Sequence, residues 1–345
     1  MRLLIFTQAV DTNDPVMGFF HGWLREFAKK FEQITVVALK GGARSLPDNV
    51  VVHSLGKEKM SNKLVMFFRL MVLIWQTRAT DAVLVHMNKE YVIAGYLIWK
   101  LKKVPVYFWY NHKKADWQAR FAMKLSRKIF YTSGHSVGAR LQNAVSMPVG
   151  VDMELFTNRQ AVNGRGRTLL SLGRIDPVKR IDVLAWAVDD LGRKNKENFN
   201  LTIAGSPGWG NEKYAASIRE VLKPLVDQGK VRFIGNVVHD KTVELFNENK
   251  IFINLTESGS FDKTILEAMA CGCLVISANR SVSGIIGSEG LIDSATPESV
   301  ARKISSSLAI SNEEAERRSA KNREFVLKNH SLNLLSDKLA HEIKP

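Results

Sequence analysis

Short apolar runs alternate with amphipathic helical stretches along most of this chain, and this rhythm limits the possible folds more than any other feature. Alternation of this kind is typical of parallel strands joined by crossover helices. The sequence therefore predicts an α/β fold of two Rossmann-like, doubly wound domains that face a central cleft. The runs interpreted as strands are residues 3–7, 34–38, 50–55, 82–85, 104–109 and 129–132 in the first half, and 169–172, 201–204, 231–234, 251–255 and 274–277 in the second.

The rhythm is interrupted between residues 143 and 167, where Pro148 and three glycines accompany few apolar runs. Clusters of Gly and Pro between periodic segments are typical of linkers. We therefore predict one domain over residues 1–150 and a second over residues 151–328. Residues 329–345 are charged and helical, and we expect that this C-terminal helix can return to the first domain.

The chain carries 49 Lys and Arg residues against 34 Asp and Glu, a formal net charge of +15. A charge of this size suits three kinds of partner, namely nucleic acid, an anionic membrane surface or phosphorylated substrates. Net charge alone does not distinguish these partners, so the positions of the basic residues in the sequence have to decide among them.

Cysteine usage and apolar runs predict where the protein works. Cys271 and Cys273 match neither a disulfide framework nor a zinc site, which is typical of a reducing compartment. The apolar run at residues 3–6 is shorter than the core of a signal peptide. The longest apolar run, residues 64–75, contains Arg69 and falls short of the ~20 residues that span a membrane. We expect a cytoplasmic protein, with peripheral attachment to the inner face of the cell membrane as a variant of that expectation.

The glycine pattern argues against two common nucleotide-binding classes. A dinucleotide enzyme carries G-x-G-x-x-G after its first strand, but here Gly18 stands alone in that region. The glycines at 205, 208 and 210 follow a strand with a different spacing. The segment from Gly235 to Thr242 ends like a Walker loop but lacks the glycine before its lysine. NAD-dependent and P-loop functions are therefore disfavoured.

A strand end leads into a basic loop at residues 173–180, Gly-Arg-Ile-Asp-Pro-Val-Lys-Arg. Gly173 allows a close backbone turn, and Pro177 is suited to start a helix. Arg174 and Lys179 lie five residues apart on this loop. Two cations at a strand–helix junction suit a diphosphate. The alternative is a solvated basic turn without a ligand.

A second strand end, at Leu255, is followed by a polar loop and a helix that begins near Lys263. The first amides of that helix, those of Lys263 and Thr264, and the helix dipole favour a phosphate. Glu267 lies one turn further on the same face, where a carboxylate can accept two hydrogen bonds from a ribose diol. The alternatives are a capping carboxylate or a Glu–Lys pair.

Together these segments resemble family 4 of the retaining glycosyltransferases, which have the GT-B fold. The resemblance extends from the first strand to the final helix. It implies that the first domain binds an acceptor and the second a nucleotide-sugar donor. The pieces that carry it are PVGVDMELF, GRIDPVKRID, TIAGSPG, VRFIGNV and GSFDKTILEAMACG, in this order.

The resemblance also implies roles for individual residues. Arg174 and Lys179 would bind the donor diphosphate together with the amides of Lys263 and Thr264, and Glu267 would bind the ribose. The other donor-binding positions that it implies are Val237, near the nucleobase, and Ser260, Phe261 and Asp262, before the helix.

The sequence departs from the family at one position. The family usually has two glutamates eight residues apart, and the residue eight before Glu267 is Gly259. Glu257 lies two residues earlier and is a candidate substitute. Because the first glutamate normally contacts the transferred sugar, recognition of the donor sugar is the property that this departure affects.

Two further candidates lie in the acceptor half. Gly18 resembles a family glycine that lets the backbone approach the donor sugar and phosphate, and a helix-start glycine is the alternative. His112 follows a strand end and resembles the family histidine that contacts the transferred sugar near the reacting carbon. A purely structural histidine is the alternative.

A basic and aromatic run, residues 100–128, contains nine Lys or Arg and one acid, Asp116. The apolar helix expected at residues 62–77 lies in the same half. Together they look like a surface for anionic lipid. The alternatives are a solvated basic face and a buried core helix.

These observations predict a retaining glycosyltransferase that moves a sugar from a UDP- or GDP-sugar to a glycan or lipid-linked acceptor, in cell-surface polysaccharide or glycolipid synthesis. No cofactor or metal is expected, because two cations and a helix dipole neutralise the leaving diphosphate. Two alternatives remain, a catalytically silent sugar-nucleotide binder and a basic nucleic-acid-binding protein. No nucleic-acid-binding motif supports the second.

Overall fold

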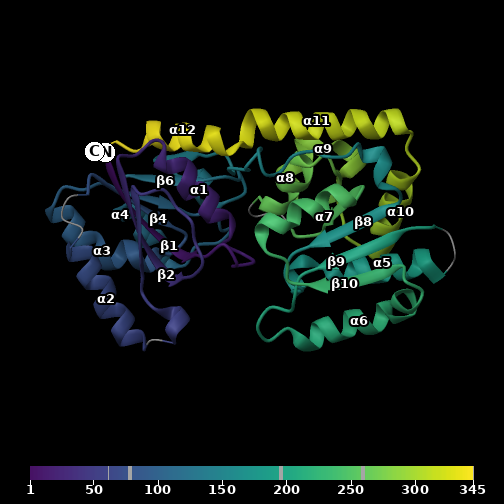
Figure 1. Ribbon diagram of the computed structural model, residues 1–345, viewed down its shortest axis with the longest axis horizontal. Helices are drawn as coiled ribbons and strands as arrows, with labels where there is room; N and C mark the ends of the chain where they lie inside the picture. Colours follow the sequence, from purple (N-terminus) through teal and green to yellow (C-terminus); the bar gives the residue numbers. More distant parts are fainter. Residues whose placement is uncertain (61, 77–79, 194–196, 258–260, 345) are drawn as a thin grey trace. The chain divides into compact units, whose positions relative to one another are not determined.

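The computed structural model describes residues 1–60, 62–76, 80–193, 197–257 and 261–344 (Figure 1). The chain divides into two compact units. One contains residues 1–150 together with residues 332–345, and the other contains residues 151–331. The central cleft that the sequence predicts between two domains stays a prediction.

The first unit is built on a seven-stranded parallel sheet with the order β3-β2-β1-β4-β5-β6-β7. The order reverses at β1 and β4, the two central strands, and both are buried on both faces. Burial on both faces explains their continuous apolar sequences. The strands are β1 (Arg2–Val10), β2 (Gln33–Gly41), β3 (Val50–Ser54), β4 (Ala82–His86), β5 (Val106–Trp109), β6 (Lys128–Tyr131) and β7 (Ala144–Ser146).

Helices cover both faces of this sheet. Because successive strand residues point to opposite faces, Leu3 and Ile5 of β1 join one core and Leu4 and Phe6 join the other. The first core includes α1 (Phe19–Ala28) and α12 (Leu332–Glu342). The second includes the helices α2 (Lys63–Gln76), α3 (Lys89–Leu101) and α4 (Trp117–Leu125).

The end of the chain belongs to the first unit. Leu335 and Leu339 of α12 are fully buried in the core that contains α1. The Tyr107 hydroxyl donates to the Lys344 carbonyl over 2.8 Å and accepts from the Lys344 amide over 2.9 Å. Lys128 also forms an ion pair with Glu342, with 2.7 Å between Nζ and Oε2. These contacts attach residues 332–344 to the first unit, although residues 151–331, which form the second unit, lie between them and residue 150 in the sequence.

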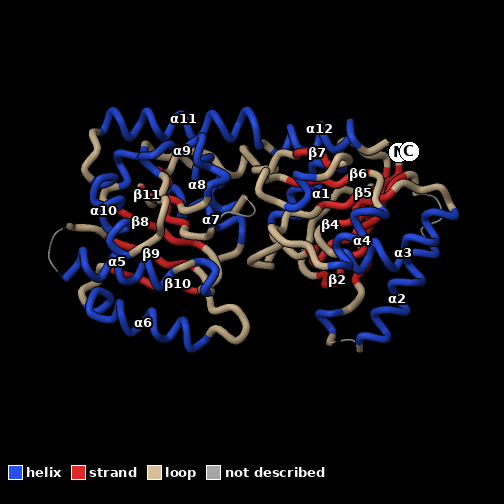
Figure 2. Tube along the Cα trace, turned by 180° about the vertical axis from the view of Figure 1, so that it is seen from behind, coloured by secondary structure: helices blue, strands red, loops and turns tan. Residues whose placement is uncertain are grey.

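The second unit contains a five-stranded parallel sheet with the order β10-β9-β8-β11-β12 (Figure 2). One face packs against α5, α6 and α10, and α11 contacts α8. The strands are β8 (Thr168–Leu172), β9 (Asn200–Ala204), β10 (Val231–Gly235), β11 (Ile251–Asn254) and β12 (Leu274–Ser277). The helices are α5 (Ile181–Arg193), α6 (Glu212–Asp227), α7 (Thr242–Glu248), α8 (Lys263–Ala270), α9 (Ser283–Gly290), α10 (Pro297–Leu308) and α11 (Asn312–His330).

The segment predicted as a linker, residues 143–167, contains more structure than its sequence indicates. It includes β7, which is too short at three residues to give a periodic signal. It also contains Arg165, which is 4% exposed. Arg165 donates to the carbonyls of Phe246 and Cys271 over 2.9 and 2.6 Å. Buried charges need partners of this kind, and backbone carbonyls leave no mark in a sequence.

The apolar run at residues 64–75 forms α2, a helix of 14 residues. Among the described residues, no helix combines the length and the apolar composition needed to cross a membrane.

The docking of α12 predicts a matched pair of stability effects. We expect Leu335→Ala to lower the free energy of unfolding of the first unit by about 2–5 kcal/mol, because it leaves a cavity in a closed core. Leu334→Ala, one residue earlier and 38% exposed, should cost much less. Urea unfolding followed by tryptophan fluorescence measures this, since Trp23 and Trp109 are buried in the same core. Equal losses for the two variants would contradict the docking.

Candidate functional site

Two loops of the second unit meet because the strands that precede them are neighbours. β8 pairs with β11, with Leu169 opposite Ile251 and Leu170 opposite Phe252. The strand order reverses here, because β9 and β10 continue on one side of β8 and β12 on the far side of β11. In open α/β sheets, ligands bind outside the carboxyl ends of strands at such a reversal. The segments that follow β8 and β11 therefore form the candidate site.

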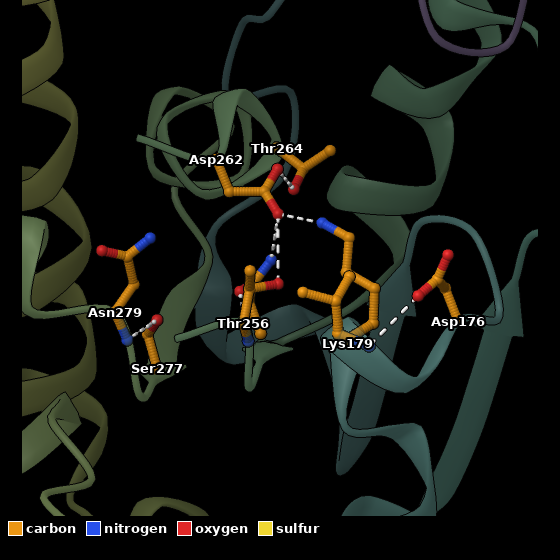
Figure 3. A network of polar contacts seen from close by, with 9 residues as sticks. Asp176, Lys179, Thr256, Asp262, Thr264, Ser277 and Asn279 are labelled. Atoms are coloured by element: carbon orange, nitrogen blue, oxygen red, sulfur yellow. Dashed lines mark hydrogen bonds and ion pairs between the residues drawn. The ribbon is translucent and has the colours of Figure 1, made fainter. Parts of the chain in front are cut away.

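Asp262 joins these two segments (Figure 3). Its carboxylate forms an ion pair with Lys179 from the other loop. It also accepts hydrogen bonds from Asn254 Nδ2 and Thr264 Oγ1, each over 2.9 Å. Burial alone would raise the pKa of Asp262, but Lys179 and the hydrogen bonds lower it to about 2. The carboxylate is therefore charged at neutral pH and holds Lys179 beside the N-terminus of α8.

The second predicted cation, Arg174, has a different environment. Its side chain is 56% exposed, and Nη1 lies 3.9 Å from Oδ2 of Asp176. Asp176 itself accepts a hydrogen bond from the Val178 amide over 3.1 Å and so caps the turn at Pro177–Lys179. Lys179 is thus held by a buried carboxylate, whereas the Arg174 guanidinium extends into solvent from the same loop.

Glycines hold this loop against its neighbour. The Gly173 amide donates to the Ala204 carbonyl over 3.0 Å. A Cβ atom on Gly205 would lie 1.9 Å from the Gly173 carbonyl oxygen, and Gly205 has φ +136°, where side chains are disfavoured. Gly205, directly after β9, therefore allows the two backbones to approach, which gives it a role that the dinucleotide motif does not explain.

Helix α8 directs its N-terminus toward the same edge of the sheet. Asp262 is its N-cap, and the Ile265 amide donates to the Asp262 carbonyl over 3.0 Å. The amides before it, those of Lys263 and Thr264, lie in the first turn, where helices leave amides without intrahelical acceptors and carry positive potential. Burial lowers the pKa of Lys263 to about 8, although the Glu267 and Asp152 carboxylates oppose this.

Glu267 is 2% exposed and has a partner that the sequence did not predict, His239. His239 Nε2 lies 2.8 Å from Glu267 Oε1, and the imidazole packs edge-on against Phe156 with 5.2 Å between ring centroids. Burial would lower the pKa of His239, but Glu267 and then Asp240 raise it to about 9. The imidazole is therefore charged at neutral pH and orients the carboxylate.

His239 could have been found from the sequence by the strand-end argument. It lies four residues after Gly235, the last residue of β10, in a turn at the same sheet edge as the other candidates. Asn254, which donates to Asp262, is the last residue of β11 and a polar residue in an apolar strand. Both residues are polar and lie at or just after the carboxyl end of a strand, which is the feature that identified the other candidates.

The remaining predicted residues of this unit lie nearby in the chain. Val237 is half-buried in the segment between β10 and His239. Phe261 packs against His330, with ring centroids 5.1 Å apart. Glu257 is exposed, and its Oε1 lies 3.8 Å from Arg180 Nη1. Ser260 and Gly259 lie outside the described residues.

Gly18 and His112 belong to the first unit. Gly18 is buried and immediately precedes α1, in the segment that follows the central strand β1. His112 follows β5 at an exposed position, with its ring edge-on to Tyr110 at 5.0 Å. Desolvation, and then the Lys89 ammonium, lower the pKa of His112. The roles of these two residues stay predictions.

Within the described ranges, no three His, Cys, Asp or Glu side chains gather as a set of metal ligands. The expectation of a reaction without a metal stays a prediction.

Solved structures show which fold class this arrangement belongs to. The structure of HepE from Anabaena in complex with UDP matches with a TM-score of 0.77 over 99% of each chain, at 14% sequence identity. Sucrose-phosphate synthase from Thermosynechococcus elongatus matches with a TM-score of 0.72, over 99% of this chain and 98% of that one, also at 14% identity. The two parallel α/β units thus form the GT-B fold, as predicted.

The family follows from the sequence of the second unit. Residues 152–325, half of the chain, match the family described as glycosyl transferases group 1. The protein belongs to this family.

Curated relatives match over shorter stretches. The O-antigen chain mannosyltransferase B of Escherichia coli is 28% identical over 128 residues, which are 36% of this chain and 32% of that protein. The D-inositol 3-phosphate glycosyltransferase of Rhodococcus jostii is 28% identical over 125 residues, 35% of this chain and 28% of the relative. The matched stretch thus spans about a third of the length of these relatives.

The His239–Glu267 pair predicts a pH dependence of stability. Because the pKa of His239 is raised from 6.5 to about 9, its stabilisation is complete below about pH 6.5 and is lost as the pH rises through about 9. Each pKa unit corresponds to about 1.4 kcal/mol. We expect the free energy of unfolding of the second unit to fall across this window in the wild type.

The matched variants are His239→Asn, which should flatten this part of the profile, and His135→Asn in the first unit, which should retain it. Chemical denaturation at a series of pH values measures all three proteins. Parallel profiles for the wild type and His239→Asn across this window would contradict the charged pair.

Proposed function

We propose that this protein is a retaining glycosyltransferase that takes its sugar from a nucleotide-sugar donor bound at the carboxyl edge of the second sheet. The observation that carries the proposal is the meeting of Lys179, Asp262 and the N-terminus of α8 at the strand-order reversal, in a chain of the glycosyl transferases group 1 family. The relatives and solved structures support it, since HepE was crystallised with UDP and with UDP-glucose.

The donor diphosphate binds against Lys179, Arg174 and the first amides of α8. A diphosphate carries more negative charge than the single Asp262 carboxylate, so it competes well for the Lys179 ammonium. Arg174 is exposed and can swing toward the same ligand. Charge-assisted hydrogen bonds and a helix N-terminus are the donors that phosphate oxygens prefer.

The nucleoside lies toward Glu267 and Val237. Glu267 accepts hydrogen bonds from the ribose diol, and His239 positions it by holding Oε1. Because His239 is cationic at neutral pH, its contact with Oε1 is charge-assisted and fixes the orientation of the carboxylate toward the ribose. Phe261 and Asp262 lie beside the phosphates, and the role that the resemblance implies for Ser260 stays a prediction.

The transfer replaces one bond at the anomeric carbon with another. The bond from this carbon to the diphosphate oxygen breaks, and a bond to the acceptor oxygen forms on the same face of the sugar. The acceptor proton passes to the leaving phosphate, which Arg174, Lys179 and the α8 amides stabilise as its charge develops. The contact with the transferred sugar that the resemblance implies for His112 and Gly18 stays a prediction. No enzymic nucleophile is assigned.

The acceptor is a glycan or a lipid-linked saccharide, and the donor is a UDP- or GDP-sugar. One relative is named O-antigen chain mannosyltransferase B and another D-inositol 3-phosphate glycosyltransferase. The first name supports a role in cell-surface polysaccharide or glycolipid synthesis, and we propose the cytoplasmic face of the membrane as the place of the reaction.

A silent sugar-nucleotide binder is the second candidate, because Gly259 stands where the family has its first glutamate. Turnover separates the two candidates, since a transferase consumes the nucleotide sugar, at least by slow hydrolysis, and a binder does not. Salt-sensitive binding to duplex DNA without nucleotide-sugar binding would instead favour a nucleic-acid-binding protein.

The donor site predicts a loss of function at both cations. We expect Arg174→Ala and Lys179→Ala each to lower kcat/KM for the nucleotide sugar by about ten- to a hundredfold, since each removes a charge-assisted contact worth about 1.5–3 kcal/mol. Arg302→Ala, an exposed arginine on α10, is the control. Because Lys179→Ala leaves Asp262 charged and buried, Lys179→Ala/Asp262→Asn should restore stability without restoring activity. If both single variants are folded and have wild-type kinetics, the proposed donor site is wrong.

Chelation tests the expectation of a reaction without a metal. We expect activity to persist in EDTA, because the cations and the helix N-terminus supply the countercharge for the diphosphate. Initial rates with and without chelator measure this. Complete loss of activity that magnesium or manganese restores would overturn it.

A further inference from the structure

Helix α2 is apolar around most of its circumference and yet lies at the surface. Only Leu70 and Ile74 of this helix are buried. A helix that is apolar all round is normally enclosed by protein or lipid. With 100° per residue, Phe68 and Val72 lie opposite the buried pair, at the centre of the outer face. The large apolar side chains that α2 exposes are Leu64, Val65, Phe67, Phe68, Val72 and Trp75.

The two helices that follow also expose large apolar side chains. Leu97 and Leu101, one turn apart on α3, are 71% and 86% exposed, and Trp117 on α4 is 74% exposed. The Lys102 ammonium lies 5.8 Å from the Trp75 ring centroid and donates to the Trp75 carbonyl over 3.3 Å. This contact joins the ends of α2 and α3, at which the exposed Trp75 and Leu101 lie. We call the exposed faces of α2, α3 and α4 the apolar ridge.

The part of the chain that forms the apolar ridge is strongly basic. Between residues 59 and 128 the sequence has fourteen Lys and Arg and only three acids, one of which, Asp116, is paired with Lys89. A hollow of about 440 Å³ lies between the ends of α3 and α4, and Lys100, Lys103 and Arg127 contribute to its lining. Cations of this kind attract anionic headgroups at about 1 kcal/mol each near a charged bilayer.

An apolar hollow adjoins the ridge. It has a volume of about 690 Å³, and its wall on the α2 side includes Val65, Phe68 and Val72. Lys59 and Arg69 also line it, and so does Glu58, whose carboxylate accepts hydrogen bonds from the Gly41 amide and the Ser54 hydroxyl. The apolar side chains of α2 suit an acyl chain, and the two cations suit its headgroup.

We propose that the apolar ridge docks the first unit on the surface of an anionic lipid bilayer. The apolar side chains enter the acyl region, and the surrounding lysines contact the headgroups. A bilayer complements both the apolar centre and the basic rim. A second copy of the chain does not, because a two-fold interface would place the same lysines against one another. At 14 residues, α2 is too short to span and suits a position in the plane of the membrane surface.

Vesicle co-sedimentation with two pairs of variants tests this proposal. One pair reverses four exposed lysines, either around the ridge (Lys59→Glu, Lys63→Glu, Lys100→Glu and Lys124→Glu) or on α6 and α11 as a control with the same change in charge (Lys213→Glu, Lys223→Glu, Lys321→Glu and Lys328→Glu). The other pair removes two exposed apolar side chains, either from the ridge (Phe68→Ser and Trp75→Ser) or from the second unit (Trp186→Ser and Leu327→Ser).

We expect the wild type and both control variants to bind vesicles of phosphatidylcholine with phosphatidylglycerol at low salt, more weakly at high salt, and to ignore phosphatidylcholine alone. Both ridge variants should bind at least about tenfold more weakly. A wild type that ignores the anionic vesicles overturns the proposal, and so do ridge variants that bind like the controls. Dimerisation of the wild type that the ridge variants lose would show that a second copy covers the surface.

The proposal does not depend on the donor site, and UDP binding by calorimetry separates the two. Ridge variants that lose vesicle binding but keep the wild-type urea unfolding transition of the first unit, followed by the fluorescence of its buried Trp23 and Trp109, have kept their fold. If the wild type binds vesicles but no nucleotide, the proposed docking surface is supported and the proposed donor site is wrong.

Discussion

The ion pair between Lys179 and Asp262 organises the candidate site of the second unit. It connects residues 83 positions apart in the chain, one from the loop after β8 and one at the N-cap of α8. A buried pair adds little net stability, but removing one partner leaves an uncompensated charge. Because hydrogen bonds and Lys179 hold the pKa of Asp262 near 2, the carboxylate requires a cation at position 179 across the physiological pH range.

In the proposed function this pair also couples the position of the loop to ligand binding. The cation proposed to meet the phosphate is the one that holds the loop against α8, so a bound diphosphate would take over part of the role of Asp262. The His239–Glu267 pair repeats the principle one turn along α8, where a buried charge is again fixed by an opposite charge from a strand-end loop. The site is thus built from compensated charges at the end of one helix, and its polar geometry is set before a ligand arrives.

Much of the fold could be predicted from the sequence, because strands buried on both faces give continuous apolar runs. β4 and β11 were recognisable in this way. The three-residue β7 was not, since it is shorter than any periodic signal. The strand-end loops identified the segments that carry Lys179, Asp262 and Glu267. The strand-end positions of His239 and Asn254 are visible in the sequence, but their pairing with Glu267 and Asp262 is not, because it depends on strand order, which a single sequence does not contain. Likewise, the apolar run at residues 64–75 fits both a core helix and a surface helix, and only the structure shows that Phe68 and Val72 face outward.

The central claim is that the strand-order reversal in the second unit binds the diphosphate of a nucleotide sugar. A crystal structure with UDP or GDP, chosen by the larger thermal shift on addition of each nucleotide, tests it most directly. The account predicts diphosphate oxygens within hydrogen-bonding distance of Lys179 Nζ, the Arg174 guanidinium and the Lys263 and Thr264 amides, with the ribose hydroxyls on Glu267. A nucleotide bound elsewhere, with the Lys179–Asp262 pair unchanged and without phosphate contacts, would contradict it.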